Sequence, residues 1–124
     1  MESKFFKILE VITPYLIYFL LLALLFDGGV TFYNYKTDYN YFINSEGNES
    51  LVAELKAGIP FFKTVTIWFP FIAYLFLVYY FQYIKRLKFK PKHQVIKGAL
   101  LTIVFFTVYI QITRHIIGGI SWLI

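Results

Sequence analysis

The sequence predicts an all-α integral membrane protein with three transmembrane helices in a single membrane domain, residues 1–124. The first observation is composition: 59% of the 124 residues are hydrophobic, 15% are charged, and the mean hydropathy is +0.63. Soluble domains are about 45–50% apolar and about 25% charged. A small soluble domain still exposes roughly a third of the surface that its unfolded chain exposes. It could therefore not bury this much apolar area. The composition therefore favours a lipid environment.

The second observation is the presence of three apolar stretches, which cover residues 8–26, 64–84 and 98–117. A helix of about 20 mostly apolar residues crosses a bilayer core about 30 Å thick. Each stretch therefore predicts one membrane span. Pro14 and Pro70 lie inside the first two spans, and we expect each to bend its helix because proline removes a backbone hydrogen bond.

The third observation is the distribution of charge, which predicts the orientation. The segment 85–97 contains six Lys and Arg residues and no acid, whereas residues 27–63 contain most of the acids. Short cytoplasmic loops are enriched in Lys and Arg. We therefore expect the N-terminus and the basic loop 85–97 inside, the loop 27–63 and the C-terminus outside, and a multi-pass protein of the cell membrane. The residues expected to bind anionic lipid headgroups on the inner side are Lys85, Arg86, Lys88, Lys90 and Lys92. This placement explains the net charge of +5 without a nucleic-acid partner.

The loop 27–63 is too long for a simple connection and is expected to be structured. Residues 31–42, TFYNYKTDYNYF, alternate aromatic with polar side chains over part of their length, which favours an extended strand or a segment in the headgroup zone. The following SLVAELKAG predicts a short amphipathic helix that Asn48 or Ser50 caps and Gly58 ends. Asn48-Glu49-Ser50 also matches the N-glycosylation pattern, and its use depends on the compartment.

The third span carries a polar stripe. Thr107, Gln111 and His115 recur every four residues, and Arg114 lies beside them, so all four share one side of a helix. Intramembrane polar residues are the first place to look for function. In one interpretation the stripe forms hydrogen bonds between spans, with Arg114 paired to Asp27 at the outer surface.

Two further interpretations of the stripe stay open. In one, His115 is a candidate ligand for a metal or haem. The other histidine, His93, is expected on the inner side and cannot reach the same metal, so a partner chain would have to complete the site. Alternatively, the stripe is part of an ion or proton path. The sequence identifies no cofactor.

The remaining motifs do not indicate catalysis. The sequence contains no cysteine, and it lacks a nucleophile elbow, P-loop, dinucleotide fingerprint or zinc-helix motif. We therefore do not expect an enzyme, although the chain could belong to an enzyme complex without supplying its catalytic residues. The second span is aromatic or aliphatic on every side, which indicates a helix surrounded by lipid or by other helices. We expect a non-catalytic accessory or structural subunit of a larger membrane complex, with other membrane subunits as partners. The alternative is a homo-oligomeric channel or carrier lined by the polar face of the third span.

Overall fold

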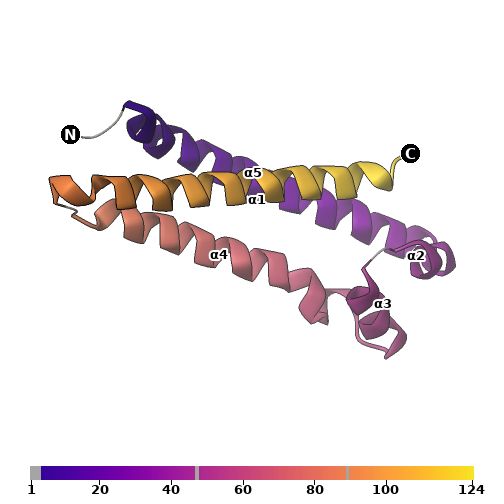
Figure 1. Cartoon of the computed structure of the whole chain (residues 1–124). Helices are drawn as coiled ribbons and strands as arrows, with labels where there is room; N and C mark the ends of the chain where they lie inside the picture. The colour runs from indigo at the N-terminus through magenta and orange to yellow at the C-terminus, as the bar shows by residue number, and fades with distance from the viewer. Residues whose placement is uncertain (1–3, 47, 89) are drawn as a thin grey trace.

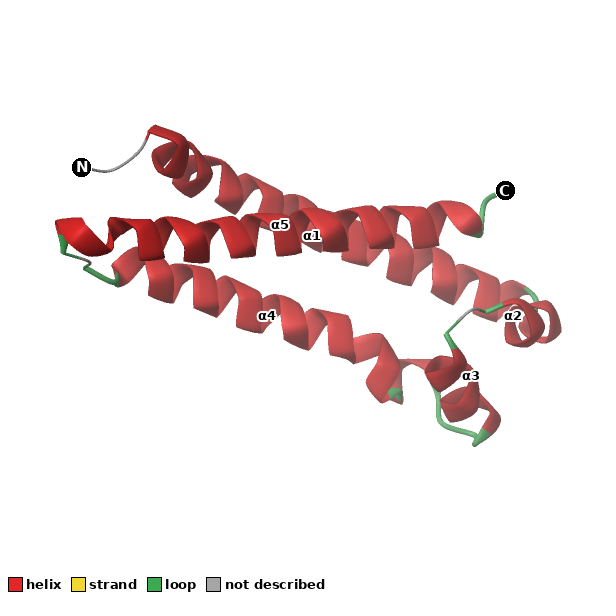
Figure 2. Cartoon of the chain, in the orientation of Figure 1, coloured by secondary structure: helices red, strands yellow, loops and turns green. Residues whose placement is uncertain are grey.

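The computed structural model describes residues 4–46, 48–88 and 90–124. Within these ranges every regular element of secondary structure is a helix, and short loops join the helices (Figure 2). Three helices are long and apolar enough to cross a membrane: α1 (Lys4–Thr37), α4 (Val65–Arg86) and α5 (Gln94–Ser121) (Figure 1). The predicted all-α architecture with three apolar spans is thereby confirmed.

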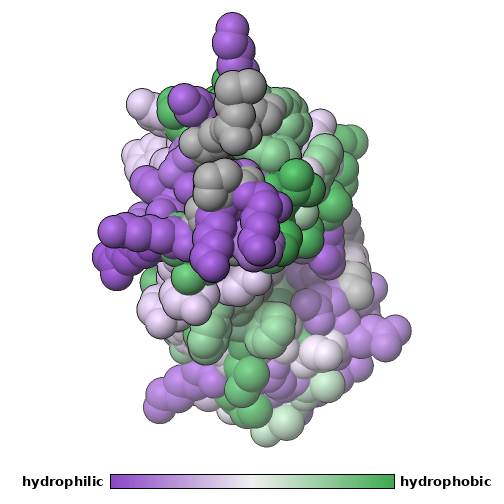
Figure 3. Space-filling model, turned by 60° about the vertical axis from the view of Figure 1, so that its left-hand side comes forward, coloured by the Kyte–Doolittle hydropathy of each residue, from purple (hydrophilic) through white to green (hydrophobic). Residues whose placement is uncertain are grey.

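Shorter helices connect the long ones. Between α1 and α4 lie α2 (Tyr39–Ser45), α3 (Glu49–Lys56) and the 3₁₀ turn η1 (Phe61–Lys63), and η2 (Pro91–His93) precedes α5. The described start of α1 and the α4–α5 connection lie at one end of the molecule, which we call the basic end; α2, α3 and the C-terminus lie at the other, the α2–α3 end (Figure 1). With the basic end turned forward, hydrophilic side chains gather on it (Figure 3).

The closest packing joins α1 to α5. Their shared core contains side chains from both helices, among them Ile17, Leu20, Leu24, Leu101, Val104 and Val108. Gly98 lies against the Phe6 ring and Gly119 against the Phe26 ring, so a Cβ at either glycine would overlap an aromatic ring of α1. Small residues allow such close approach of neighbouring helices.

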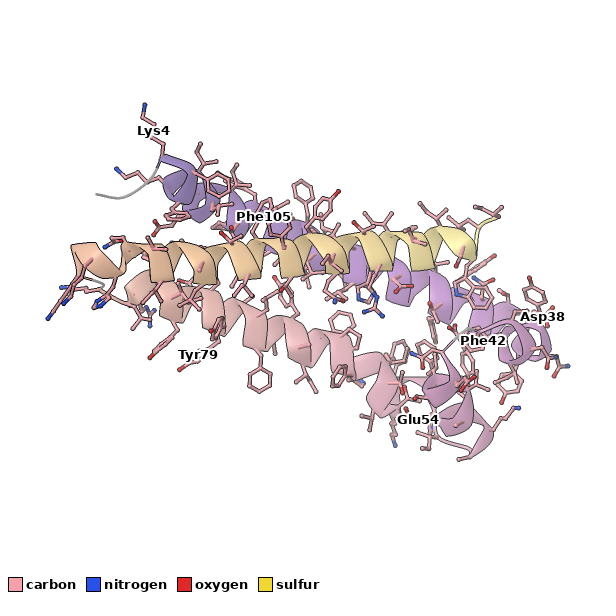
Figure 4. The ribbon with its side chains drawn as sticks, in the orientation of Figure 1. Lys4, Asp38, Phe42, Glu54, Tyr79 and Phe105 are labelled. Atoms are coloured by element: carbon pink, nitrogen blue, oxygen red, sulfur yellow. The ribbon has the colours of Figure 1, made fainter. Side chains whose placement is uncertain are left out.

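The helix α4 is held at two places. Phe81 and Ile84 are buried in the core shared with α1 and α5. At the α2–α3 end, Ile67 packs against a second cluster that comprises Phe42, Leu51, Leu55 and Phe61. Between these places one side of α4 is partly buried against the same core, but most of the helix is exposed: only 6% of the residues in its most hydrophobic 18-residue stretch are buried. Tyr79, for example, points away from the other helices (Figure 4).

The structure corrects the prediction for residues 31–42. The helix α1 continues past the predicted boundary at residue 26 to Thr37, and α2 follows at once, so an extended strand there is wrong. The aromatic residues of this segment also recur at intervals of three and four (Phe32, Tyr35, Tyr39 and Phe42), and they pack on one side against Phe61 or Trp122 or each other. The helix passes through Gly28 and Gly29, and the Thr31 hydroxyl donates to the carbonyl of Asp27 at 2.7 Å.

The helix α3 begins after Asn48, whose side-chain oxygen accepts the N–H groups of Ser50 at 3.1 Å and Leu51 at 3.3 Å. This is the bonding of an N-cap, which satisfies donors that the first helical turn leaves free. The helix ends at Lys56, and Gly58 follows with a φ of 88°, a conformation that favours glycine. Leu51 and Leu55 are buried and pack α3 against α2 and α4.

Candidate functional site

A cavity of about 470 Å³ lies among the long helices at the α2–α3 end. Figure 1 shows that α4 and α5 diverge toward this end. We call it the polar cavity because many of its lining side chains are polar: Asp27, Thr31, Tyr41, Ser45, Glu46, Asn48, Thr66, His115 and Ser121. They come from α1, α2, α4, α5 and the α2–α3 connection, so the polar cavity is a product of the tertiary fold.

Asp27 and His115 form the centre of the polar cavity. The Nδ1 atom of His115 lies 2.7 Å from Oδ2 of Asp27, and the two side chains are 19% and 25% exposed, respectively. Opposite an aspartate carboxylate, Nδ1 carries the proton and donates, which leaves Nε2 for another partner. A Cβ at Gly118 would lie 3.2 Å from Oδ1 of Asp27, so the glycine leaves room for the carboxylate.

The expected pairing of Arg114 with Asp27 is not what the structure shows. Asp27 bonds to the neighbouring residue His115 instead, and among the described residues no ion pair involves Arg114. Successive residues of a helix point about 100° apart, so only one of these two neighbours can face α1. The contacts of Gly98 and Gly119 with α1 fix the rotation of α5 about its axis so that His115 faces α1.

Arg114 lines a second cavity of about 580 Å³, which we call the lateral cavity. It lies between α4 and α5, with Leu20 and Leu24 of α1 behind it. All four residues of the predicted stripe (Thr107, Gln111, Arg114 and His115) line it. The stripe therefore faces a cavity formed within one chain.

Glu54 is a structural site that the sequence did not reveal. Its carboxylate accepts the N–H groups of Val65 at 2.6 Å and Thr66 at 3.0 Å, together with the Thr66 hydroxyl (Figure 4). The Thr66 hydroxyl is the main cause that lowers the pKa of Glu54 below its ordinary value; burial opposes it, and the two N–H groups lower the pKa by smaller amounts. A carboxylate at a helix N-terminus is favoured by the helix dipole. Glu54 thus fixes the start of α4 to α3 beside both cavities.

The residues of the basic end are far from these cavities. Lys85, Arg86, Lys88, Lys90 and Lys92 are all exposed there, and Lys97 lies 4.0 Å from Glu10 across the α1–α5 contact. His93 precedes α5 and His115 lies toward the far end of that helix. About 30 Å of helix therefore separates the two histidines. Within the described ranges, no group of three or more His, Asp or Glu residues is placed to hold a metal ion.

Comparison with known proteins adds no further assignment. No protein-family model matches the sequence, and no curated protein and no solved structure is significantly similar to it.

Proposed function

We propose that the protein is a non-catalytic accessory or structural subunit of a larger membrane protein complex. The observation that supports this proposal is the open surface of α4. One side of α4 packs on the core shared with α1 and α5, and its start packs on the cluster around Phe61, but only 6% of the residues in its most hydrophobic 18-residue stretch are buried. Such a helix needs lipid or other helices around it. Its exposed Phe69, Phe76 and Tyr79 give the large aromatic contacts that are enriched in interface cores.

The proposed location is the cell membrane, with the N-terminus inside and the C-terminus outside. The exposed Lys and Arg residues of the basic end support it, because such residues are retained on the cytoplasmic side, where they also meet anionic lipid headgroups. On α4, exposed Trp68 lies near one end and Tyr79, Tyr80 and Tyr83 near the other, as expected for aromatic belts at two membrane interfaces.

Orientation can be tested directly because the chain has no cysteine. Lys56→Cys and Lys90→Cys place one thiol at the end of α3 and one at the basic end, respectively. A membrane-impermeant maleimide applied to intact cells should label the first variant only, and the second only after permeabilisation. The opposite pattern would overturn the orientation, and labelling of both in intact cells would overturn the membrane crossing.

Assembly is tested by a photo-crosslinking amino acid at Phe76, which is exposed at the centre of α4. The control position is Phe5, exposed near the start of α1. We expect the Phe76 variant to yield a crosslink to another membrane protein that co-purifies in mild detergent. A chain that purifies as a stable monomer and gives no protein crosslink at Phe76 contradicts the subunit role.

A homo-oligomeric channel or carrier is the second candidate, and the observation in its favour is that the α5 stripe lines the lateral cavity. A path there would run between α4 and α5 of one chain. Ion flux into vesicles that contain the purified protein should then fall for Gln111→Leu, while Gln82→Leu, an exposed position outside both cavities, should leave it unchanged. Absence of flux in the wild-type protein rejects this candidate.

A further inference from the structure

The polar cavity and the lateral cavity are adjacent, and we call the two together the groove. Their linings share Leu24, Asn48, Thr66, Pro70 and His115. Along α4 the lining of the lateral cavity extends from Val65 to Leu77, and along α5 it extends from Thr107 to His115. These stretches correspond to about 18 Å and about 12 Å of helix, respectively. The groove is therefore elongated parallel to the helices, which is the direction of an acyl chain in a bilayer.

The two ends of the groove differ in chemistry. Around Leu20, Ala73 and Leu77 its walls are largely apolar. At the other end lie charges of both signs, with Arg114 as the cation and Asp27 and Glu46 as the acids. A guanidinium binds phosphate oxygens well, and a carboxylate binds an ammonium. The charged end, where the two cavities meet at His115, therefore matches a ligand that carries both a phosphate and an ammonium.

Asp27 has bonding capacity to offer such an ammonium. Its bond to His115 uses Oδ2, and a carboxylate has two oxygens that each accept more than one hydrogen bond. Asp27 and Gly118 both line the polar cavity, so the carboxylate borders its volume. The cavity volumes are about 470 Å³ and about 580 Å³. Both volumes are typical of small-molecule sites.

The depth of the charged end agrees with a headgroup. The helix α5 contains 28 residues. A helix of that length spans about 42 Å, close to the full thickness of a bilayer with its headgroup regions. Arg114 lies two turns before Ser121, the last residue of α5, and two turns of helix rise about 10 Å. This depth is a few Å inside the boundary between headgroups and hydrocarbon, from where the long Arg114 side chain can extend outward to the phosphate level.

We propose that this groove binds a phospholipid with a phosphoethanolamine headgroup, with its phosphate at Arg114, its ammonium at Asp27 and Glu46, and an acyl chain between α4 and α5. The lipid enters sideways from the bilayer through the lateral cavity. The inference rests on the membrane placement proposed above and is independent of the subunit role. If the chain retains this lipid but has no protein partner, only the subunit role is refuted. If the complex assembles without the lipid, only this inference is refuted.

The test is native mass spectrometry of the full chain in mild detergent, after incubation with equimolar phosphatidylethanolamine and phosphatidylglycerol. At the groove, whose binding Ala73→Phe removes, wild-type protein should retain phosphatidylethanolamine in preference. Phosphatidylglycerol bound at the basic end should stay in that variant. Arg114→Gln should weaken retention about tenfold, as expected for loss of a charge-assisted hydrogen bond. Ala73→Phe should also reduce it by filling the apolar part of the groove, and Glu46→Gln should reduce the preference over phosphatidylglycerol.

Each variant has a matched control outside both cavities. Lys36→Gln, Ala99→Phe and Glu49→Gln change exposed residues and should retain the lipid as wild type does. Three results overturn the proposal: release by Ala73→Phe of as much phosphatidylglycerol as phosphatidylethanolamine, loss of lipid from the controls as well, or a co-purifying protein in place of lipid. Displacement by soluble phosphoethanolamine at the same concentration as the lipid also overturns it, because the ligand is then a small zwitterion.

Discussion

The packing of α1 on α5 can be tested with matched glycine substitutions. Gly98 of α5 and Gly29 of α1 are both inside helices, but their surroundings differ. A Cβ at Gly98 overlaps the Phe6 ring, whereas a Cβ at Gly29 meets no atom within 4 Å. Gly98→Ala and Gly29→Ala therefore make the same chemical change with and without a steric consequence.

The expected magnitudes follow from two opposing effects. Alanine in place of glycine within a helix stabilises by about 0.5–1 kcal/mol, and this is the expected gain for Gly29→Ala. At Gly98 the same gain is opposed by overpacking, which costs about 1–3 kcal/mol when the ring must move. The two variants should therefore differ by about 1–3 kcal/mol in the free energy of unfolding, with Gly98→Ala the less stable.

The assay is reversible unfolding in mixed detergent micelles followed by helical circular dichroism. A third variant isolates the contact: when Phe6 is also replaced by alanine, Gly98→Ala should become stabilising, as at Gly29. If Gly98→Ala alone stabilises the protein as much as Gly29→Ala does, the α1–α5 packing described above is refuted.

Three further predictions concern other contacts. Asp27→Asn should lower the free energy of unfolding by about 1.5–3 kcal/mol because it removes a charged hydrogen-bond acceptor; a double-mutant cycle should show coupling to His115→Gln and none to Arg114→Gln, and the reverse would restore the pairing expected from the sequence. Leu101→Ala, at a fully buried core position, should lower it by about 2–5 kcal/mol and the exposed Ile103→Ala by under about 1 kcal/mol, in the same unfolding assay; equal losses would contradict the core. Because the folded-state pKa of Glu54 is lowered from 4.5, its contribution to stability is present above the unfolded value and is lost as the pH falls through the folded value. Glu54→Gln should therefore flatten the decline in melting temperature as the pH falls below 4.5, whereas Glu49→Gln should not; an unchanged decline in Glu54→Gln would refute the role of this carboxylate.

The parts of the fold that lipid chemistry dictates were predictable from the sequence. A chain in hydrocarbon must satisfy its backbone hydrogen bonds internally, so three long apolar stretches lead to three helices. The end of α1 was not predictable in the same way. Gly28 and Gly29 resemble a turn, and the aromatic residues that follow fit both a strand and a helix until Phe61 and Trp122 are placed against them.

The candidate site was likewise predictable from the sequence only in part. A spacing of four placed Thr107, Gln111 and His115 on one face, because that is a property of α5 alone. The partner of Asp27 depends on the rotation of α5 about its axis, which the contacts of Gly98 and Gly119 with α1 determine. Glu54 was missed for a related reason: its bonds to Val65 and Thr66 cross η1, and no local pattern encodes them.

The groove follows from how α4 is attached. At the basic end Phe81 and Ile84 fill the space between α4 and its neighbours, and at the other end Glu54 and the cluster around Phe61 hold the start of α4 to α3. Between these attachments Tyr74 and Leu77 pack only partly against the core, and with Pro70 and Ala73 they line the lateral cavity. Because α3 rather than α5 holds that end, the position of the cavities depends on the short helices outside the apolar core. Substitutions that loosen α3 should therefore alter the groove while leaving the α1–α5 pair intact.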